Sequence, residues 1–251
     1  MIQVDGRPVE CEYVAGDPTL PVLVFLHEGL GSIDLWRGLP GEIAAAAGGP
    51  ATLTYARHGH GASGPANMPR SVTYMHHEAD TVLPDLLDAL AIERPILVGH
   101  SDGASIALLY AGAGHPVAGL VCLAPHVFVE SESIAGIEQA RQMFASTDMA
   151  ERMGRYHNDP VATFRGWNDV WLSDEFRAWN IVGRLAGITA PVLAIQGVDD
   201  QYGTLAQLDA IESGVSGAFD RVVLDGVGHS PHTEAAAEVV AAIATFVTGL
   251  R

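Results

Sequence analysis

A short stretch at residues 99–103, Gly-His-Ser-Asp-Gly, carries the side chain best suited to covalent chemistry in this sequence. An apolar run at 95–98 precedes it, and a helix-like run at 104–110 follows it. A sharp turn from a strand into a helix presents a serine hydroxyl for reaction, and such a turn needs glycine or nearly so on either side. The context therefore predicts that Ser101 is a nucleophile at a nucleophile elbow, with an ordinary glycine-rich turn as the alternative.

A nucleophilic serine needs a histidine as base and a carboxylate that orients the histidine. An apolar run at 191–195 leads into Gly-Val-Asp-Asp at 197–200, and another at 222–224 leads into Asp-Gly-Val-Gly-His at 225–229. Both runs are typical of strands, and the carboxyl ends of parallel strands meet at one edge of a sheet. We therefore expect Ser101, one of the two aspartates and His229 to converge there. His232 is the competing histidine, but we expect it at the start of a closing helix over 232–250.

Five segments of the chain resemble the motifs of the α/β-hydrolase superfamily. They are the elbow, the turns that end at Asp200 and His229, the segment His-Glu-Gly-Leu-Gly at 27–31 after a strand-like run, and Arg-His-Gly-His-Gly-Ala-Ser at 57–63. The last segment is similar to the family's R-G-x-G-x-S turn with one residue inserted. The resemblance implies the α/β-hydrolase fold, a mostly parallel, doubly wound sheet with a helical cap insertion. By the family's G-x-x-D pattern the acid is Asp200, and Asp199 is the alternative.

The order of strand-like and helix-like segments indicates how the chain is divided. Asp5-Gly6 predicts an antiparallel hairpin at the start, and strand signals near residues 22, 52, 96, 119, 192 and 222 alternate with helical patterns. We predict a hydrolase core formed by residues 1–125 and 188–251, with a helical cap at 126–187. In the superfamily such an insertion covers the site and sets substrate choice. We therefore expect His126, Trp167 and Trp171 to contact substrate, with packing of the cap against the core as the alternative for each tryptophan.

The family pattern also implies an oxyanion hole made of the backbone N–H groups of Gly29 and Asp102. Glu28 departs from that pattern, which usually has glycine directly after the histidine. An ionised carboxylate without a partner would oppose the negative charge that develops there. We expect the Glu28 side chain to bind loop amides or to pair with Arg57, with substrate contact as the alternative. The Asp102 side chain is expected to cap the following helix and offset its dipole, with substrate contact again as the alternative.

Composition excludes several other chemistries. All thirteen basic residues are arginine, so a Schiff-base lysine, a P-loop lysine and a Ser-Lys dyad are ruled out. The formal net charge of −17 argues against binding to nucleic acid or to anionic membranes. The chain has no His-Glu-x-x-His motif and only two cysteines, Cys11 and Cys122, so we expect neither a metal, nor an organic cofactor, nor a disulfide framework. The start of the sequence lacks the apolar core of a signal peptide, and we expect a cytoplasmic protein.

These features together predict a serine hydrolase that acts through an acyl-enzyme on a small carboxylic ester, lactone or thioester. One alternative is a hydrolase that cleaves a C–C bond in a ring-fission product with the same three residues. Another is a receptor that binds a small molecule on the same fold without turnover. Dehalogenases and epoxide hydrolases of the superfamily use an aspartate nucleophile, and Ser101 disfavours both.

Overall fold

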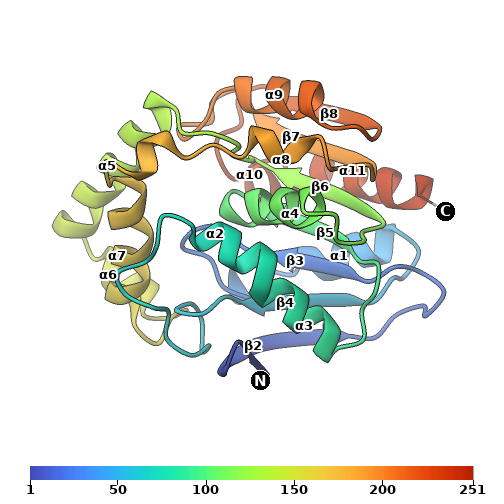
Figure 1. Ribbon diagram of the computed structural model, residues 1–251, viewed down its shortest axis with the longest axis horizontal. Coiled ribbons are helices and arrows are strands. Elements are labelled where there is room, and N and C mark those ends of the chain that lie inside the picture. The colour runs from blue at the N-terminus through green and yellow to red at the C-terminus, as the bar shows by residue number, and fades with distance from the viewer. Residues whose placement is uncertain (251) are drawn as a thin grey trace.

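The computed structural model describes residues 1–250, which form one eight-stranded sheet with helices on both of its faces (Figure 1). The spatial order of the strands is β1-β2-β4-β3-β5-β6-β7-β8. Their bounds are β1 Ile2–Val4, β2 Arg7–Val14, β3 Leu23–Leu26, β4 Thr52–Ala56, β5 Ile96–His100, β6 Gly119–Leu123, β7 Val192–Gly197 and β8 Phe219–Leu224.

The sheet is antiparallel at one edge and parallel everywhere else. β1 and β2 form the hairpin predicted from the Asp5-Gly6 turn, where both residues have positive φ, and β2 pairs antiparallel with β4. All remaining neighbours, from β4 through β3 to β8, pair in parallel. The predicted mostly parallel, doubly wound sheet is therefore confirmed, and the carboxyl ends of β5, β7 and β8 lie at the same edge.

Continuous apolar runs in the central strands supply a core on each face of the sheet. In β3, Leu23 and Phe25 belong to one cluster, whereas Val24 and Leu26 belong to the other. Strands covered on both faces need apolar side chains at every position, because successive side chains point to opposite faces. The first cluster is closed by α1 (Leu39–Ala46) and α11 (Ala236–Gly249). The second cluster is closed by α2 (Tyr74–His77), the π-helix η2 (Glu78–Val82), α3 (Leu83–Ala89), α4 (Asp102–Gly112) and α9 (Ala206–Gly214).

Helices fill the chain between β6 and β7. They are α5 (Ser131–Ser146), α6 (Met149–Met153), α7 (Pro160–Trp171), the short 3-10 helix η3 (Phe176–Ala178) and α8 (Val182–Leu185). Figure 1 shows α5, α6 and α7 grouped together at the left-hand end of the molecule. The rings of Phe144 on α5 and Phe164 on α7 stack with centroids 3.9 Å apart, which holds the two longest of these helices together. The boundaries of a separate cap domain at 126 and 187 stay a prediction.

The single closing helix expected over 232–250 is wrong. The chain forms α10 (Pro231–Glu234) and then α11, and Ala235 between them has φ −134° and ψ 51°. The Glu234 carboxylate accepts hydrogen bonds from the backbone N–H groups of Gly228 and Ser230, at 2.8 and 3.1 Å. A side chain that binds the preceding loop in this way fixes the short helix on the turn that carries His229, and the second helix then begins in a new direction.

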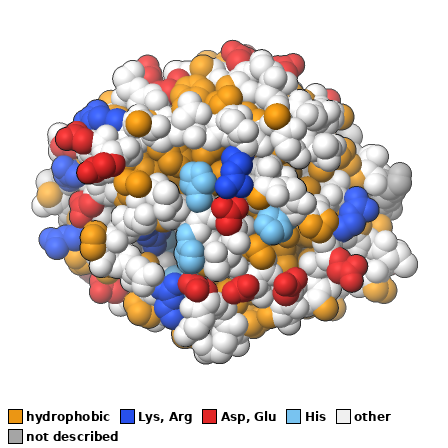
Figure 2. All heavy atoms as spheres, viewed as in Figure 1, with side chains coloured by type: hydrophobic (Ala, Val, Ile, Leu, Met, Phe, Trp, Pro, Cys, Tyr) orange, Lys and Arg blue, Asp and Glu red, His pale blue; other side chains and the backbone are white. Residues whose placement is uncertain are grey.

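Acidic and basic side chains are interspersed on the face of the molecule shown in Figure 2. Histidine side chains lie over α2 near the middle of this face, close to arginine and acidic side chains. Arg184 and Asp80 form an ion pair of 3.2 Å between α8 and η2. Within residues 1–250, no helix is both long enough and apolar enough to span a membrane.

Candidate active site

Ser101 stands between the end of β5 and the start of α4 in a strained backbone conformation, with φ 52° and ψ −117°. The turn is tight because strand and helix nearly touch. A Cβ at Gly99 would lie 2.4 Å from the carbonyl oxygen of Gly103, and one at Gly103 would lie 2.0 Å from that of Leu26. Both glycines are therefore required by close packing. The Ser101 N–H donates to the carbonyl oxygen of Leu123 at 2.9 Å, which ties the strained residue to β6.

Asp200 and His229 meet at the same edge of the sheet, after β7 and β8. The His229 Nδ1 atom lies 2.8 Å from Asp200 Oδ1 and 2.9 Å from Oδ2. An ionised carboxylate only accepts hydrogen bonds, so Nδ1 is the protonated nitrogen in this contact and Nε2 is left free to act as a base. Asp199, the alternative acid, is exposed, and its N–H donates to the carbonyl oxygen of Val227. The geometry thus pairs His229 with Asp200 and leaves Asp199 in the turn.

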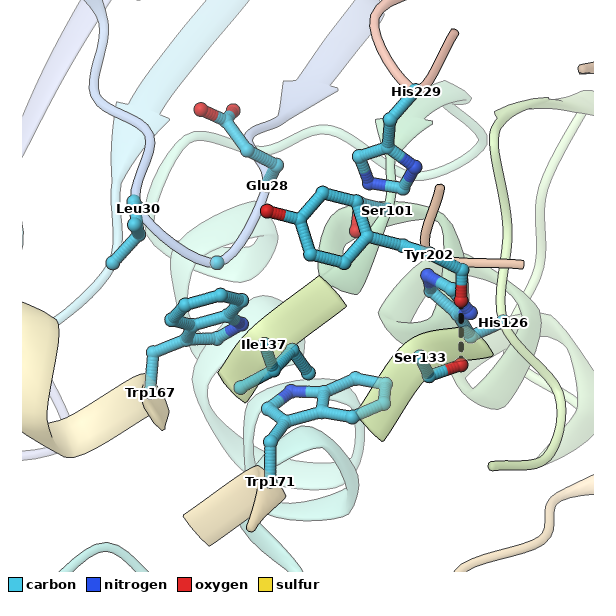
Figure 3. Close-up of a pocket in the computed structure, with 11 residues that line it drawn as sticks. Glu28, Leu30, Ser101, His126, Ser133, Ile137, Trp167, Trp171, Tyr202 and His229 are labelled. Carbon is cyan, nitrogen blue, oxygen red and sulfur yellow. Dashed lines mark hydrogen bonds between the residues drawn. The ribbon is translucent and has the colours of Figure 1, made fainter. Parts of the chain in front are cut away.

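Ser101 and His229 line the same cavity, and Figure 3 shows the His229 ring beside Ser101 at the cavity wall. The backbone of His229 is held from behind, where His100 Nε2 donates to its carbonyl oxygen at 2.8 Å. On the cavity side, the Tyr202 ring lies 4.7 Å from the His229 ring, centroid to centroid. The first contact holds the backbone of His229, and the second packs against its imidazole ring.

Asp200 is held as an anion by its neighbours. Burial raises the pKa of this carboxyl group, but the His229 ring and the backbone N–H of Tyr202 lower it by more, so that its pKa lies below the usual range. The Tyr202 N–H donates to Asp200 Oδ1 at 2.8 Å, and the Gln196 amide donates to Oδ2 at 3.3 Å. A carboxylate that stays ionised in this position favours the tautomer of His229 that carries its proton on Nδ1.

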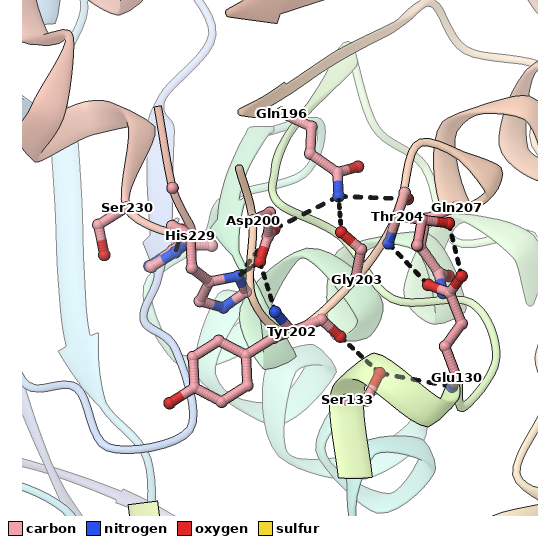
Figure 4. Close-up of polar contacts among 12 residues, drawn as sticks. Glu130, Ser133, Gln196, Asp200, Tyr202, Gly203, Thr204, Gln207, His229 and Ser230 are labelled. Atoms are coloured by element: carbon pink, nitrogen blue, oxygen red, sulfur yellow. Dashed lines mark hydrogen bonds and ion pairs between the residues drawn. The ribbon is translucent and has the colours of Figure 1, made fainter. Parts of the chain in front are cut away.

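The loop that follows Asp200 is tied to the first helix after β6 (Figure 4). Glu130, at the N-terminus of α5, accepts from the backbone N–H of Thr204 at 2.9 Å and from the Gln207 amide at 2.6 Å. Ser133, one turn into α5, donates from its hydroxyl to the carbonyl oxygen of Tyr202. The position of the loop that carries Asp200 and Tyr202 therefore depends on the position of α5.

The two residues expected to form the oxyanion hole occupy different positions relative to Ser101. Gly29 lines the cavity, and Asp102 follows Ser101 as the first residue of α4. The Asp102 side chain makes no capping hydrogen bond, so the expected cap is wrong, whereas its place in the first turn of α4 agrees with the expected compensation of the helix dipole. Asp102 is not among the residues that line the cavity, which disfavours the alternative of substrate contact. It is fully buried, accepts a hydrogen bond from the Tyr74 hydroxyl, and lies 3.9 Å from the Arg57 guanidinium. Trp171 Nε1 in turn donates to the Tyr74 hydroxyl at 3.0 Å, which links the cavity wall to Asp102.

Glu28 lines the cavity, but its carboxylate points away from the tryptophans in Figure 3. Its Oε2 lies 3.7 Å from His100 Nδ1. The expected pairing with Arg57 is wrong for the side chain, because Arg57 donates to the backbone carbonyl of Glu28, at 2.8 Å. Burial raises the pKa of the Glu28 carboxyl, but His100 and the glutamate's own N–H lower it to about 2. The carboxylate is therefore ionised at neutral pH and compensated by groups behind the cavity.

The cavity is small, about 140 Å³, and most of its wall is apolar or aromatic. Trp167 and Trp171 from α7 form one side, with exposed fractions of 7% and 2%. His126 lies on the same wall as Trp171, with ring centroids 5.3 Å apart, and its Nδ1 has no hydrogen-bond partner. Burial lowers the pKa of His126 to about 3, so the ring is neutral. The three residues expected to contact substrate from the region after β6 all line this cavity.

Sequence reasoning missed several residues that complete the site. Tyr202 stands two residues after Asp200, and an aromatic side chain so close to the predicted acid was a signal that could have been used. Tyr74 had no such signal, because 28 residues separate it from Asp102 and 97 from Trp171. Further side chains that line the cavity are Leu30, Ser133 and Ile137. Among residues 1–250, no group of three or more histidine, cysteine or acidic side chains could hold a metal ion.

Comparison with known proteins matches residues 23–242 to the model of a family described as the alpha/beta hydrolase family. That match covers most of the chain. This protein belongs to the alpha/beta hydrolase family. A segment of 82 residues, 32% of the chain, is 37% identical to epoxide hydrolase A of Mycobacterium tuberculosis. The segment covers 26% of that protein's length, so the likeness concerns only part of it.

Solved structures of other hydrolases share the fold over the whole chain. A carboxylesterase structure from the ammonia-oxidizing thaumarchaeon Nitrososphaera gargenis matches with a TM-score of 0.80 and 18% identity, over 99% of this chain and 98% of that one. The enol-lactonase from Burkholderia xenovorans LB400 matches with a TM-score of 0.76 and 18% identity, over 98% and 99% of the two chains. At this level of identity the similarity establishes the fold, and activity has to be argued from the site.

Proposed function

We propose that this alpha/beta hydrolase is a serine hydrolase that cleaves a small, uncharged carboxylic ester, lactone or thioester through an acyl-enzyme. One observation carries the proposal: His229, oriented by Asp200 at 2.8 Å, stands with the strained Ser101 at the wall of one small cavity. This is the arrangement in which a histidine activates a serine. The serine at the elbow also distinguishes this site from the aspartate chemistry of dehalogenases and epoxide hydrolases.

The reaction follows from the positions of these groups. Ser101 Oγ attacks the carbonyl carbon while His229 Nε2 takes the hydroxyl proton, and the N–H groups of Gly29 and Asp102 stabilise the oxyanion. Collapse of the tetrahedral intermediate breaks the C–O or C–S bond, and His229 returns the proton to the leaving group. A water molecule then attacks the acyl-enzyme with His229 as base, and the acid product leaves Ser101 free.

The cavity wall supports a substrate without charge. Arginine is absent from the described side chains that line it, and the chain has no lysine. The flat rings of Trp167, Trp171 and Tyr202 favour an apolar or aromatic acyl group. These features argue against the alternative of C–C cleavage in a ring-fission product, which carries carboxylates that need a cationic partner.

The test combines active-site labelling with turnover. Intact mass spectrometry follows the adduct formed with an uncharged alkyl fluorophosphonate, and absorbance follows hydrolysis of p-nitrophenyl acetate and butyrate. We expect labelling at Ser101 and ester turnover in the native enzyme. Ser101→Ala should lose both, and His229→Ala should reduce kcat by about 10⁴-fold or more. Ser146→Ala, at an exposed serine of α5, is the matched control and should behave as the native enzyme.

The outcomes separate the three functions. Labelling without hydrolysis of simple esters would move the assignment to C–C cleavage, because the nucleophile would be active on another bond. Absence of labelling would contradict an activated serine and would favour a receptor. A receptor should bind small apolar ligands equally well with serine or alanine at position 101.

A further inference from the structure

A second cavity, of about 270 Å³, lies outside the active site. Its wall is formed by Arg7 at the start of β2, by the loop between β4 and α2, and by the helical residues that follow. The ring of Tyr74 belongs to this wall, while its hydroxyl is the group that bonds Asp102 and Trp171. This cavity shares no lining residue with the active-site cavity.

Two buried side chains in this wall lack hydrogen-bond partners. His58 is 3% exposed, and neither of its ring nitrogens makes a hydrogen bond of normal distance and angle, although the ring interacts with the Arg7 backbone. Glu78 is 7% exposed, and its Oε2 is also without a partner. Leaving a buried polar group unpaired costs roughly 1–3 kcal/mol, so native proteins seldom do so without a ligand or ordered water nearby. A polar ligand in this cavity would therefore satisfy hydrogen-bonding groups that are otherwise unpaired.

The same wall contains a guanidinium that makes no direct ion pair. The Arg70 guanidinium lies 5.0 Å from the centre of the Tyr74 ring and donates to the carbonyl oxygen of His58 at 3.2 Å. No carboxylate of residues 1–250 lies within 4.0 Å of it. Glu78 and Asp102 attract this guanidinium only from a longer distance, and burial raises the pKa of the Glu78 carboxyl. Arg7, in contrast, is neutralised by Asp5 at 2.7 Å.

We propose that this second cavity binds a small oxyanion, a carboxylate or phosphate, with Arg70 as its charge partner and His58 as a hydrogen-bond donor. The guanidinium offers planar donors that match the oxygens of either group. A cavity of about 270 Å³ has room for either group. The net charge of −17 does not prevent binding, because exposed charges beyond about 8–10 Å are largely screened at physiological ionic strength.

Two ligands test the proposal and separate the sources of the oxyanion. Inorganic phosphate binding is followed by ³¹P line broadening, and acetate binding by saturation transfer to its methyl protons, each with chloride added to equal ionic strength. We expect saturable binding of at least one anion. Arg70→Gln should weaken it at least tenfold, Arg70→Lys should weaken it less because the charge remains, and His58→Phe should also weaken it.

The matched control is Arg94→Gln, which removes an exposed arginine that does not line the cavity. It should bind as the native protein does, because bulk charge changes equally in the two arginine-to-glutamine variants. Equal affinity in the Arg70 and Arg94 variants would overturn the proposal, and so would the absence of saturable binding of both anions. Ester hydrolysis and circular dichroism identify variants that do not fold, and the Arg70→Lys variant keeps the test decisive if Arg70→Gln is among them.

Discussion

Asp199 and Asp200 are neighbours in sequence with opposite surroundings in the structure. Asp200 is buried against His229 and accepts two further hydrogen bonds, whereas the side chain of Asp199 is exposed. The difference arises from the turn after β7, which directs alternate side chains inward and outward. Only one of the two carboxylates can orient the base, so the two positions should respond very differently to loss of charge.

We expect Asp200→Asn to lower kcat by about 10⁴-fold, because an amide does not hold His229 in the tautomer that leaves Nε2 free. Asp199→Asn should leave kcat within about twofold of the native value, since surface substitutions change little. Steady-state hydrolysis of p-nitrophenyl acetate measures both. Similar losses in the two variants would contradict the assignment of Asp200.

His126 should act on substrate binding rather than on proton transfer. With its pKa at about 3, the ring does not titrate in the working range, and it lies in the cavity wall beside Trp171. His126→Phe should therefore raise KM at least threefold with a smaller change in kcat, and His126→Gln should restore part of the loss. The pH profile of kcat between pH 5 and 8 should be the same in all three proteins. A shifted profile would mean that His126 exchanges protons during turnover.

Individual residues of the site could be predicted from sequence where a turn motif fixes their backbone. Three residues are of this kind, namely Ser101, Asp200 and His229. Each comes after a strand and belongs to a short turn motif that indicates its position. Glu28 and Asp102 could be named, but their partners could not, because Tyr74, Arg57 and His100 reach them only through the packing of distant segments. Local sequence determines the backbone position of a residue, and tertiary packing determines which groups its side chain contacts.

Among the structural elements, α5 is hydrogen-bonded directly to the loop that follows Asp200. Its N-terminal Glu130 satisfies a backbone N–H of its own first turn, reciprocally with Ser133, and also binds Thr204 and Gln207 beyond the acid. One carboxylate thus joins a helix terminus to the loop after β7. A sequence pattern could indicate the helix, but this long-range bond has no local signal.

Removal of that carboxylate should loosen the loop. We expect Glu130→Ala to lower the free energy of unfolding by roughly 1–3 kcal/mol, because it leaves buried donors unpaired. It should also reduce kcat more than it changes KM, since Asp200 would orient His229 less well. Urea unfolding and steady-state kinetics measure the two effects. Glu132→Ala, at an exposed acid in the same helical turn, should change stability by no more than about 0.5 kcal/mol. Equal effects at both positions would contradict the coupling.

The molecule as a whole buries many neutral histidines. Burial lowers the pKa of His126 and of His232 to about 3, and it lowers the pKa of His27 and His60 well below the usual range. In the unfolded chain these rings titrate near pH 6.5. Between pH 6.5 and their folded pKa values, the unfolded chain therefore binds more protons than the native protein. Stability rises with pH in that window and is lost as the pH falls.

We expect the free energy of unfolding to decrease steadily from pH 6.5 downward, by about 1.4 kcal/mol per pH unit for each fully buried neutral histidine. Glu28 adds to this loss only below about pH 4.5, because its folded pKa of about 2 is depressed. Urea unfolding at pH 7, 6 and 5 measures the slope, and His126→Gln should make it shallower. A stability that stays constant over this range would contradict the neutral state of these buried rings.

The two tryptophans of α7 should differ in their tolerance of substitution. Trp171 is hydrogen-bonded to Tyr74, and through it to the buried carboxylate of Asp102 next to Ser101, so a substitution at 171 should disturb the turn at Ser101 along with the pocket. Trp167 has no such bond and packs where a Cβ on Gly29 would lie 2.3 Å from its ring. A smaller residue at 167 would enlarge the space next to the oxyanion loop. Homologues with new acyl preferences should therefore diverge first at 167, while position 171 is retained.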